Sequence, residues 1–125
     1  MNTLENLKYS KSHEWLRYDG DEVYIGITDF AQESLGDLVF INLPEVGEEV
    51  CLGESFADVE SVKAVSDVIS PVTGVVSEIN EDLLDAPEDI NSDPYESWFI
   101  KVKDITETEE LLDNIAYENF AEAEG

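Results

Sequence analysis

The chain has 125 residues, enough to bury the core of one domain but too few for a second. Thirty-one acidic residues against six basic ones give a formal net charge of −25 at pH 7, and a surface of this charge repels nucleic acids and anionic membranes. The acidity either favours partners with basic docking faces or only aids solubility. Hydrophobic residues still make up 42% of the chain, which excludes a wholly disordered acidic polymer.

Short strand segments separated by turns are predicted for the N-terminal third. Residues 15–18 run into Asp19-Gly20-Asp21, a hairpin signal, and residues 22–27 follow as a segment rich in strand formers. Asp29 is predicted to cap a short helix that ends at Gly36, because glycine suits a left-handed residue after a helix.

Further strand segments are rich in β-branched and aromatic residues and are bounded by Gly or Pro. They lie at residues 38–43, 56–59, 65–69, 75–79 and 98–103. The second and third form a predicted hairpin. The acidic stretch of residues 81–89 lacks the pattern of a calcium loop and is interpreted as a solvated loop.

Only the C-terminal tail has a clear helical period. Thr106 and Glu109 have the spacing of a capping box. Apolar residues follow on one helical face, at Leu111, Leu112, Ile115, Ala116 and Phe120. This pattern predicts an amphipathic helix over about residues 107–121. Short strands with one late helix indicate a mainly β fold of two packed antiparallel sheets.

The residues offer little to catalysis or metal binding. His13 and Cys51 are the single histidine and cysteine, so they cannot make a tetrahedral zinc site, and His13 alone is weak support for a catalytic base. No Gly-rich phosphate loop occurs. One cysteine, no import or secretion signal and no long apolar run lead us to expect a cytoplasmic protein.

Lys63 is the residue that draws attention. It lies between Val62 and Ala64 at the tip of the predicted hairpin, and these small apolar neighbours fit a tight turn from which the long side chain projects. A primary amine displayed in this way invites covalent attachment. The alternative is an ordinary solvated lysine, which is the usual state of this residue type.

A series of short motifs supports the first interpretation. They are Ser12-His13-Glu14-Trp15, Ile25-Gly26-Ile27-Thr28-Asp29, Leu43-Pro44-Glu45-Val46-Gly47, Glu60-Ser61-Val62-Lys63-Ala64, Ser70-Pro71-Val72-Thr73-Gly74 and Asn91-Ser92-Asp93-Pro94-Tyr95. Their order and spacing resemble the H proteins of glycine cleavage systems. The resemblance implies one lipoyl-carrier domain over residues 1–125, a barrel-sandwich hybrid of the lipoyl/biotinyl type. Its core spans about residues 22–103, with the lysine at a hairpin tip, a short internal helix and the C-terminal helix.

The resemblance also implies the function. Lys63 is expected to carry lipoate in amide linkage, in a monomeric carrier that catalyses nothing alone. The implied partners are a pyridoxal-phosphate glycine decarboxylase, a tetrahydrofolate-dependent aminomethyltransferase, a flavin dihydrolipoyl dehydrogenase and a lipoylating enzyme.

Individual residues carry over from the family by position. Glu60 is expected to be read by the lipoylating enzyme, and Ser12, Glu14 and Asp67 to line a cleft that holds the loaded arm. The chain departs from the family at Phe30 or Ser34, where many members have His, and at Glu96-Ser97-Trp98, where most have Gly before the Trp.

Three alternatives remain within and beyond this fold. The protein could relay lipoate to other enzymes. A biotinyl carrier uses the same turn, but its ligase typically reads Met on both sides of the lysine, where this chain has Val62 and Ala64. An interaction module without any modification is the third alternative.

Overall fold

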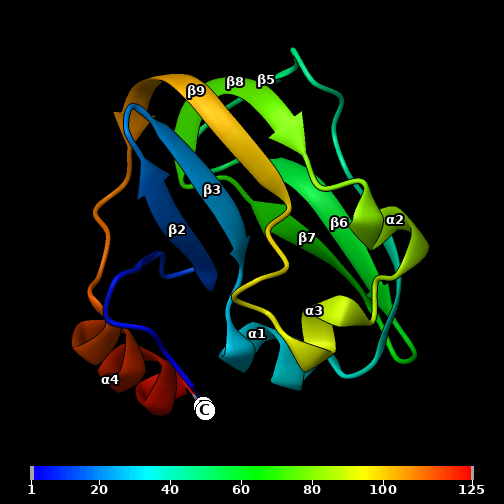
Figure 1. Ribbon diagram of the computed structural model, residues 1–125. Coiled ribbons are helices and arrows are strands. Elements are labelled where there is room, and N and C mark those ends of the chain that lie inside the picture. The colour runs from blue at the N-terminus through cyan, green and yellow to red at the C-terminus, as the bar shows by residue number, and fades with distance from the viewer. Residues whose placement is uncertain (1, 125) are drawn as a thin grey trace.

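Two antiparallel sheets face each other in the computed structural model, which describes residues 2–124, and most of the helices gather at one end (Figure 1). The six-stranded sheet has the order β1 (Lys8–Tyr9), β2 (Glu14–Asp19), β3 (Glu22–Ile27), β9 (Ile100–Thr108), β8 (Val72–Ile79) and β5 (Glu49–Val50). The three-stranded sheet has the order β4 (Leu38–Asn42), β6 (Ser55–Ser61) and β7 (Val65–Ile69). The helices are α1 (Asp29–Leu35), α2 (Asp82–Asp85), α3 (Asp89–Ser92) and α4 (Asn114–Glu124).

The main core lies between the two sheets. Strand residues of alternate positions point to opposite faces, and the inward sets are apolar. From the six-stranded sheet they include Ile25, Val76 and Val102, and from the three-stranded sheet Ile41 and Val59, all fully or almost fully buried. The mainly β prediction with two packed antiparallel sheets is therefore confirmed.

A second, aromatic cluster fixes α4 to the rest of the protein. The rings of Tyr9 and Tyr117 stack with centroids 4.8 Å apart, and the Trp15 Nε1 donates a hydrogen bond of 3.0 Å to the carbonyl oxygen of Pro94. The Trp15 ring lies so close to Gly26 that a Cβ there would be 2.7 Å from it. The cluster therefore joins both chain ends to the edge of the large sheet.

The start of the C-terminal helix was predicted wrongly. Thr106 lies in β9, which continues to Thr108 because residues 107 and 108 pair with the beginning of β8. The helix starts only at Asn114, where the Asp113 Oδ1 accepts a 2.8 Å hydrogen bond from the Ala116 backbone N–H. Its buried face carries Tyr117 and Ala121, whereas Ile115 and Ala116 are exposed.

Other boundaries differ in smaller ways. Thr28, not Asp29, caps α1, since its hydroxyl accepts a bond from the Ala31 N–H. Gly36 follows α1 with a φ of 83° and a ψ of −163°, so it has the positive φ that favours glycine but not the left-handed helical conformation that was expected. The acidic stretch of residues 81–89 is not a plain loop, because it contains α2 and the beginning of α3. No helix among residues 2–124 is long and apolar enough to cross a membrane.

Candidate functional site

Lys63 lies in a tight turn between β6 and β7, as predicted. The backbone N–H of Ser61 donates a 2.8 Å hydrogen bond to the carbonyl oxygen of Ala64, which closes the turn. The Ser61 Oγ accepts hydrogen bonds from the N–H groups of Lys63, at 3.2 Å, and Ala64, at 3.1 Å. A hydroxyl that satisfies two turn donors makes the backbone around the lysine well defined.

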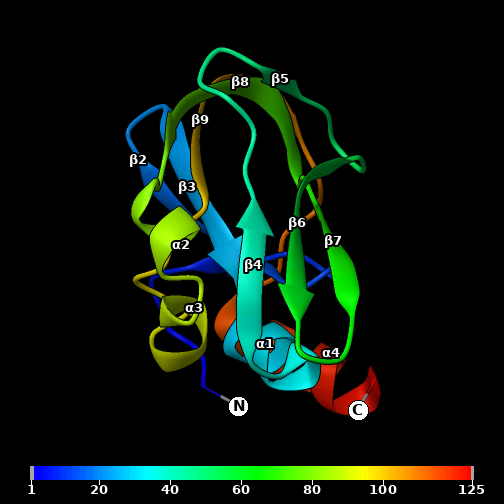
Figure 2. The same ribbon diagram turned by 90° about the vertical axis from the view of Figure 1, so that its right-hand side faces the viewer.

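The turn is also held against the segment that follows α1. The Val62 N–H donates a 3.1 Å hydrogen bond to the Asp37 carbonyl oxygen. The Lys63 side chain passes over Gly36, where a Cβ would lie 3.0 Å from the Lys63 Cε. Figure 2 shows this turn at the same end of the molecule as α1 and α4. Glycine at position 36 thus serves both the backbone turn and the room for the lysine stem.

The Asn91 side chain of α3 is hydrogen-bonded to the segment between α1 and β4. The Asn91 Nδ2 donates to the Gly36 carbonyl oxygen at 2.9 Å and to the Gln32 Oε1 at 3.0 Å. The Asn91 Oδ1 accepts a 2.8 Å bond from the Leu38 N–H. One amide therefore fixes the end of α1 and the start of β4, against which the lysine turn rests.

Glu60 lies on the outer face of the small sheet and is half-buried. Its direct cross-strand neighbours are Phe40 on β4 and Val65 on β7. It therefore belongs to the surface around the lysine turn and not to the cleft described next.

A cleft of about 290 Å³ opens between α1, the start of β2 and the edge strand β7. It brings together Ser12, Glu14 and Asp67, the three residues expected to form an arm-holding cleft. The remaining lining is mostly apolar, and α1 contributes Phe30, Ala31, Ser34 and Leu35 to it. Phe30 and Ser34, the two positions at one of which the resemblance leads us to expect His in many members, are thus both part of the cleft wall.

The carboxyl group of Glu14 is the unusual group in this cleft. It is almost fully buried, and its Oε1 accepts hydrogen bonds from the Ser10 hydroxyl at 2.7 Å and the Ser12 hydroxyl at 2.5 Å. Burial raises the pKa of Glu14 from 4.5 to about 7, although the two hydroxyl bonds work in the opposite direction. The carboxyl group therefore exchanges its proton near neutral pH, and a cation in the cleft would favour its charged form.

Buried polar groups behind Glu14 support the same wall. The Tyr117 hydroxyl lies 2.8 Å from the His13 Nδ1 and 2.7 Å from the Thr28 Oγ1. The His13 Nε2 lies 2.7 Å from the Glu124 carboxylate. The His13 backbone is left-handed, with a φ of 74°. His13 thus has a structural place between α4 and the cleft, and Tyr117 and Thr28 are supporting residues that sequence reasoning missed.

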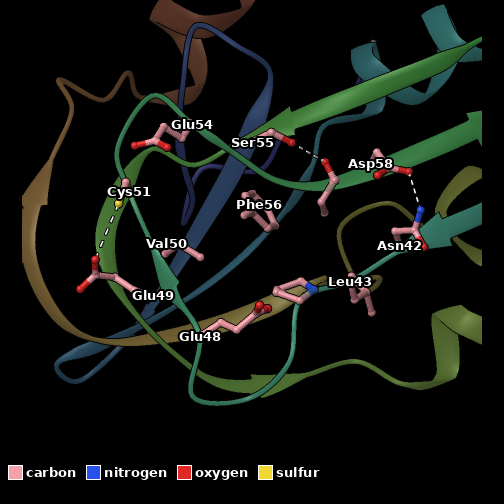
Figure 3. Close-up of a pocket in the computed structure, with 12 residues that line it drawn as sticks. Asn42, Leu43, Glu48, Glu49, Val50, Cys51, Glu54, Ser55, Phe56 and Asp58 are labelled. Carbon is pink, nitrogen blue, oxygen red and sulfur yellow. Dashed lines mark hydrogen bonds between the residues drawn. The ribbon is translucent and has the colours of Figure 1, made fainter.

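A second hollow lies far along the small sheet from the lysine turn. It measures about 340 Å³ and contains none of the predicted site residues (Figure 3). Its lining includes the carboxylates Glu48, Glu49, Glu54 and Asp58, together with Cys51, whose Sγ lies 3.9 Å from the Glu49 Oε1. We call it the acidic hollow. Among residues 2–124, no group of three or more His, Cys, Asp or Glu side chains could hold a metal ion.

Comparison with known proteins gives one consistent result. The model of the glycine cleavage H-protein family matches residues 7–124. The glycine cleavage system H protein of Lachnoclostridium phytofermentans is 62% identical over 99% of this chain and 98% of its own length. A mitochondrial H protein of Arabidopsis thaliana is 52% identical over 97% of this chain and 80% of its own length.

A solved structure supports the fold as well. The crystal structure of the glycine cleavage system H protein from Mycobacterium marinum has a TM-score of 0.88 and is 43% identical, covering 94% of this chain and 97% of that one. The resemblance inferred from the short motifs is confirmed. The chain belongs to the glycine cleavage H-protein family.

Proposed function

We propose that Lys63 carries lipoate in amide linkage and that Ser12, Glu14 and Asp67 hold the loaded arm. The chain is a lipoyl carrier of the glycine cleavage system, as its family membership implies, and not an enzyme. The observation that carries the proposal is an exposed lysine on a braced turn, next to a helix that also lines a cleft with a buried carboxyl group.

The residues present fit a covalent arm at Lys63. Its amine is exposed, and its stem lies against Gly36, the residue that ends α1. Four side chains of α1 form part of the cleft wall. The attachment point and the cleft therefore share one short helix, so an arm on Lys63 starts beside the cleft that would hold its far end.

The lipoyl group, when attached, would supply a disulfide that is reduced as one sulfur takes up the aminomethyl unit from glycine, and the dithiol left after transfer of that unit would be reoxidised with loss of two electrons. The chain itself supplies the holding. Glu14 offers a buried carboxyl group, Asp67 an exposed carboxylate at the rim and Ser12 a hydroxyl between solvent and Glu14. These oxygens can accept hydrogen bonds from a cationic amine, while the apolar lining keeps water away.

The proposed partners follow from the same membership. They are the pyridoxal-phosphate glycine decarboxylase, the tetrahydrofolate-dependent aminomethyltransferase, the flavin dihydrolipoyl dehydrogenase and the lipoylating enzyme. A flexible arm of about ten rotatable bonds keeps its end at an effective concentration on the order of millimolar near a docked active site. Relay of lipoate to other proteins remains a second function compatible with the same lysine.

Substitution of the lysine tests the attachment directly. Lys63→Arg should abolish modification and carrier activity with the melting temperature unchanged, because an exposed turn residue adds little stability and arginine does not form the amide. Intact mass measures the adduct, and a lipoyl, a biotinyl and no adduct give different masses. A lipoyl adduct on the Lys63→Arg protein would overturn the assignment, and a biotinyl adduct on the wild type would favour the biotin-carrier alternative.

The role of Glu60 is tested separately. Glu60→Ala should slow lipoylation of Lys63 while the melting temperature stays within a degree or two of the wild type, since Glu60 is half-buried on a sheet surface. Glu110→Ala is a matched control, because Glu110 is exposed between β9 and α4. Equal lipoylation rates for Glu60→Ala and Glu110→Ala would remove the recognition role.

A further inference from the structure

Four large apolar side chains are exposed around the lysine turn. Val39 and Phe40 on β4 are 55% and 47% exposed, Val65 on β7 is 66% exposed, and Val62, next to the lysine, is 71% exposed. We call these four residues the lysine-tip patch. The other exposed large apolar residues among those described, Tyr18, Val46, Leu84 and Ile115, lie singly on separate elements, as is ordinary for a protein surface.

The strand residues of the patch lie on the outer face of the three-stranded sheet. Phe40, Glu60 and Val65 are direct neighbours across β4, β6 and β7, so their side chains point to the same, outer side. The inner side of these strands carries Ile41 and Val59, which are buried in the core. Internal packing therefore does not explain the exposed apolar residues. Their gathering around the modified lysine needs another cause.

Apart from Lys63 in its turn, the charged residues around the patch are acidic. The next outward row of the sheet pairs Asn42, Asp58 and Asp67, and Glu60 lies within the patch itself. The three-stranded sheet contains no basic residue, and Lys63 in its turn is the nearest one in the sequence. A complementary surface would be apolar at its centre and basic at its rim.

We propose that the lysine-tip patch is the docking surface for the lipoylating enzyme, an acyltransferase with an apolar contact region and a basic rim. The proposal rests on the carrier function proposed above. In the acylation, the neutral Lys63 amine attacks the carbonyl carbon of an activated lipoyl donor. A C–N bond forms, the bond to the leaving group breaks, and the amine loses one proton to a base of the enzyme.

The distance between Lys63 and each enzyme's active site distinguishes the lipoylating enzyme from the other partners. Bond formation at the Lys63 Nζ requires an active site within bonding distance of the amine, so that enzyme must cover the residues next to the lysine. Val62 directly precedes Lys63, and Val65 follows Lys63 by two positions. An enzyme that acts on the far end of the finished arm works a lipoyl length away and has no such need. The acyltransferase is therefore the partner that must bury this patch.

The experiment compares acylation with later use of the arm. The double variant Phe40→Ser with Val65→Thr removes apolar surface but keeps Glu60 and the turn intact. Acylation is measured with a purified lipoylating enzyme and its activated lipoyl donor, and intact mass follows the adduct. The kcat/KM of the double variant should fall at least tenfold, mainly through a higher KM, because burial of such side chains supplies binding energy. The single variants Val46→Ser and Ile115→Ser, exposed elsewhere, are controls that should keep the wild-type rate.

A second measurement separates docking from use of the arm. The double variant, acylated to completion over a longer time, should support glycine cleavage with the wild-type KM for the carrier, and its melting temperature should match the wild type. Wild-type acylation kinetics for the double variant would overturn the proposal. So would an equal loss in acylation and in glycine cleavage, which would assign the patch to the enzymes that use the arm. Failure of the wild type itself to be acylated at Lys63 would instead refute the carrier proposal.

Discussion

The two hollows of this protein hold carboxyl groups in opposite ways. The acidic hollow has four carboxylates on its lining, and three of them are exposed to water. The cleft lined by α1 has two, Glu14 and Asp67. Glu14 is buried, accepts hydrogen bonds from two hydroxyl groups and has a pKa raised to about 7. Charge alone therefore does not distinguish the two hollows in a chain this acidic. Burial of a carboxyl group against apolar neighbours does, because only there does its protonation respond to what occupies the cleft.

The largest effect expected from this difference is a dependence of the unfolding free energy on pH, caused by Glu14. Glu14 titrates at about 7 in the folded protein and near 4.5 when exposed, so the native state binds more protons between these values. The stability from Glu14 is therefore present at low pH and is lost as pH rises through 7. Between pH 5.5 and 8.5, the wild type should lose about 2 kcal/mol relative to Glu14→Gln, measured by urea unfolding at both values.

A control for this prediction comes from the other hollow. Glu48→Gln changes an exposed carboxylate of the acidic hollow, and its unfolding free energy should follow the wild type in parallel across the same pH range. General repulsion among the acids affects all three proteins alike and cancels in the differences. If the unfolding free energies of the wild type and Glu14→Gln ran parallel across this pH range, Glu14 would be charged throughout it. The two hollows would then not differ in how they hold their carboxyl groups.

A smaller effect concerns the buried support behind the cleft. Tyr117→Phe removes the hydroxyl between the His13 Nδ1 and the Thr28 Oγ1, so two polar groups lose a partner. We expect a loss of about 1 kcal/mol in unfolding free energy. NMR shifts should change at the cleft residues His13 and Ala31 and stay constant in the acidic hollow.

Tyr18→Phe is the matched control for that change. Tyr18 is 49% exposed on β2, so removing its hydroxyl should leave the unfolding free energy within error of the wild type. If Tyr117→Phe were as stable as Tyr18→Phe, the hydroxyl network would have no part in holding the cleft wall.

The smallest expected effect lies in the acidic hollow. Burial of the thiol together with the charges of Glu54 and Glu49 raises the pKa of Cys51, which lowers the reactive thiolate fraction at pH 8. Glu49→Gln should therefore speed alkylation by iodoacetamide about two- to threefold, and salt should do the same in the wild type by screening. Glu122→Gln changes an exposed carboxylate of α4, at the end of the molecule opposite β5 (Figures 1 and 2), and should alkylate at the wild-type rate. Salt-independent alkylation would contradict a role for these charges.

The strands and the lysine turn were predictable because their signals are local. Two short segments with β-branched and aromatic residues flank Lys63, and Asp19-Gly20-Asp21 marks the first hairpin, which the structure confirms at β2 and β3. The helix start was not predictable in the same way. Thr106 and Glu109 have the spacing of a cap, but pairing with Val72 and Thr73 of β8 holds the chain extended to Thr108. Asp113, three residues before Ala116, was the signal that could have placed the helix correctly.

The cleft residues were predicted from the family resemblance and not from any pattern in the sequence itself. Ser12 and Glu14 lie on β2 or just before it, whereas Asp67 lies on β7 in the other sheet, and no local pattern joins them. Glu14 is buried in a cleft whose lining comes from α1 and from strands of both sheets, which is a tertiary property. The same holds for Tyr117, whose hydroxyl reaches His13 from a helix 104 positions later in the chain.

The bracing of the lysine turn has a consequence for how the arm searches. Hydrogen bonds of Ser61 and Val62 leave the Lys63 backbone little freedom of its own, and Asn91 in turn holds the segment to which Val62 is bonded. The base of the proposed lipoyl arm would then be a fixed pivot, and its tip would explore a shell whose radius is set by the lysine and lipoyl bonds alone. Loosening the pivot, for example by Ser61→Ala, would enlarge that volume and dilute the tip at every active site at once.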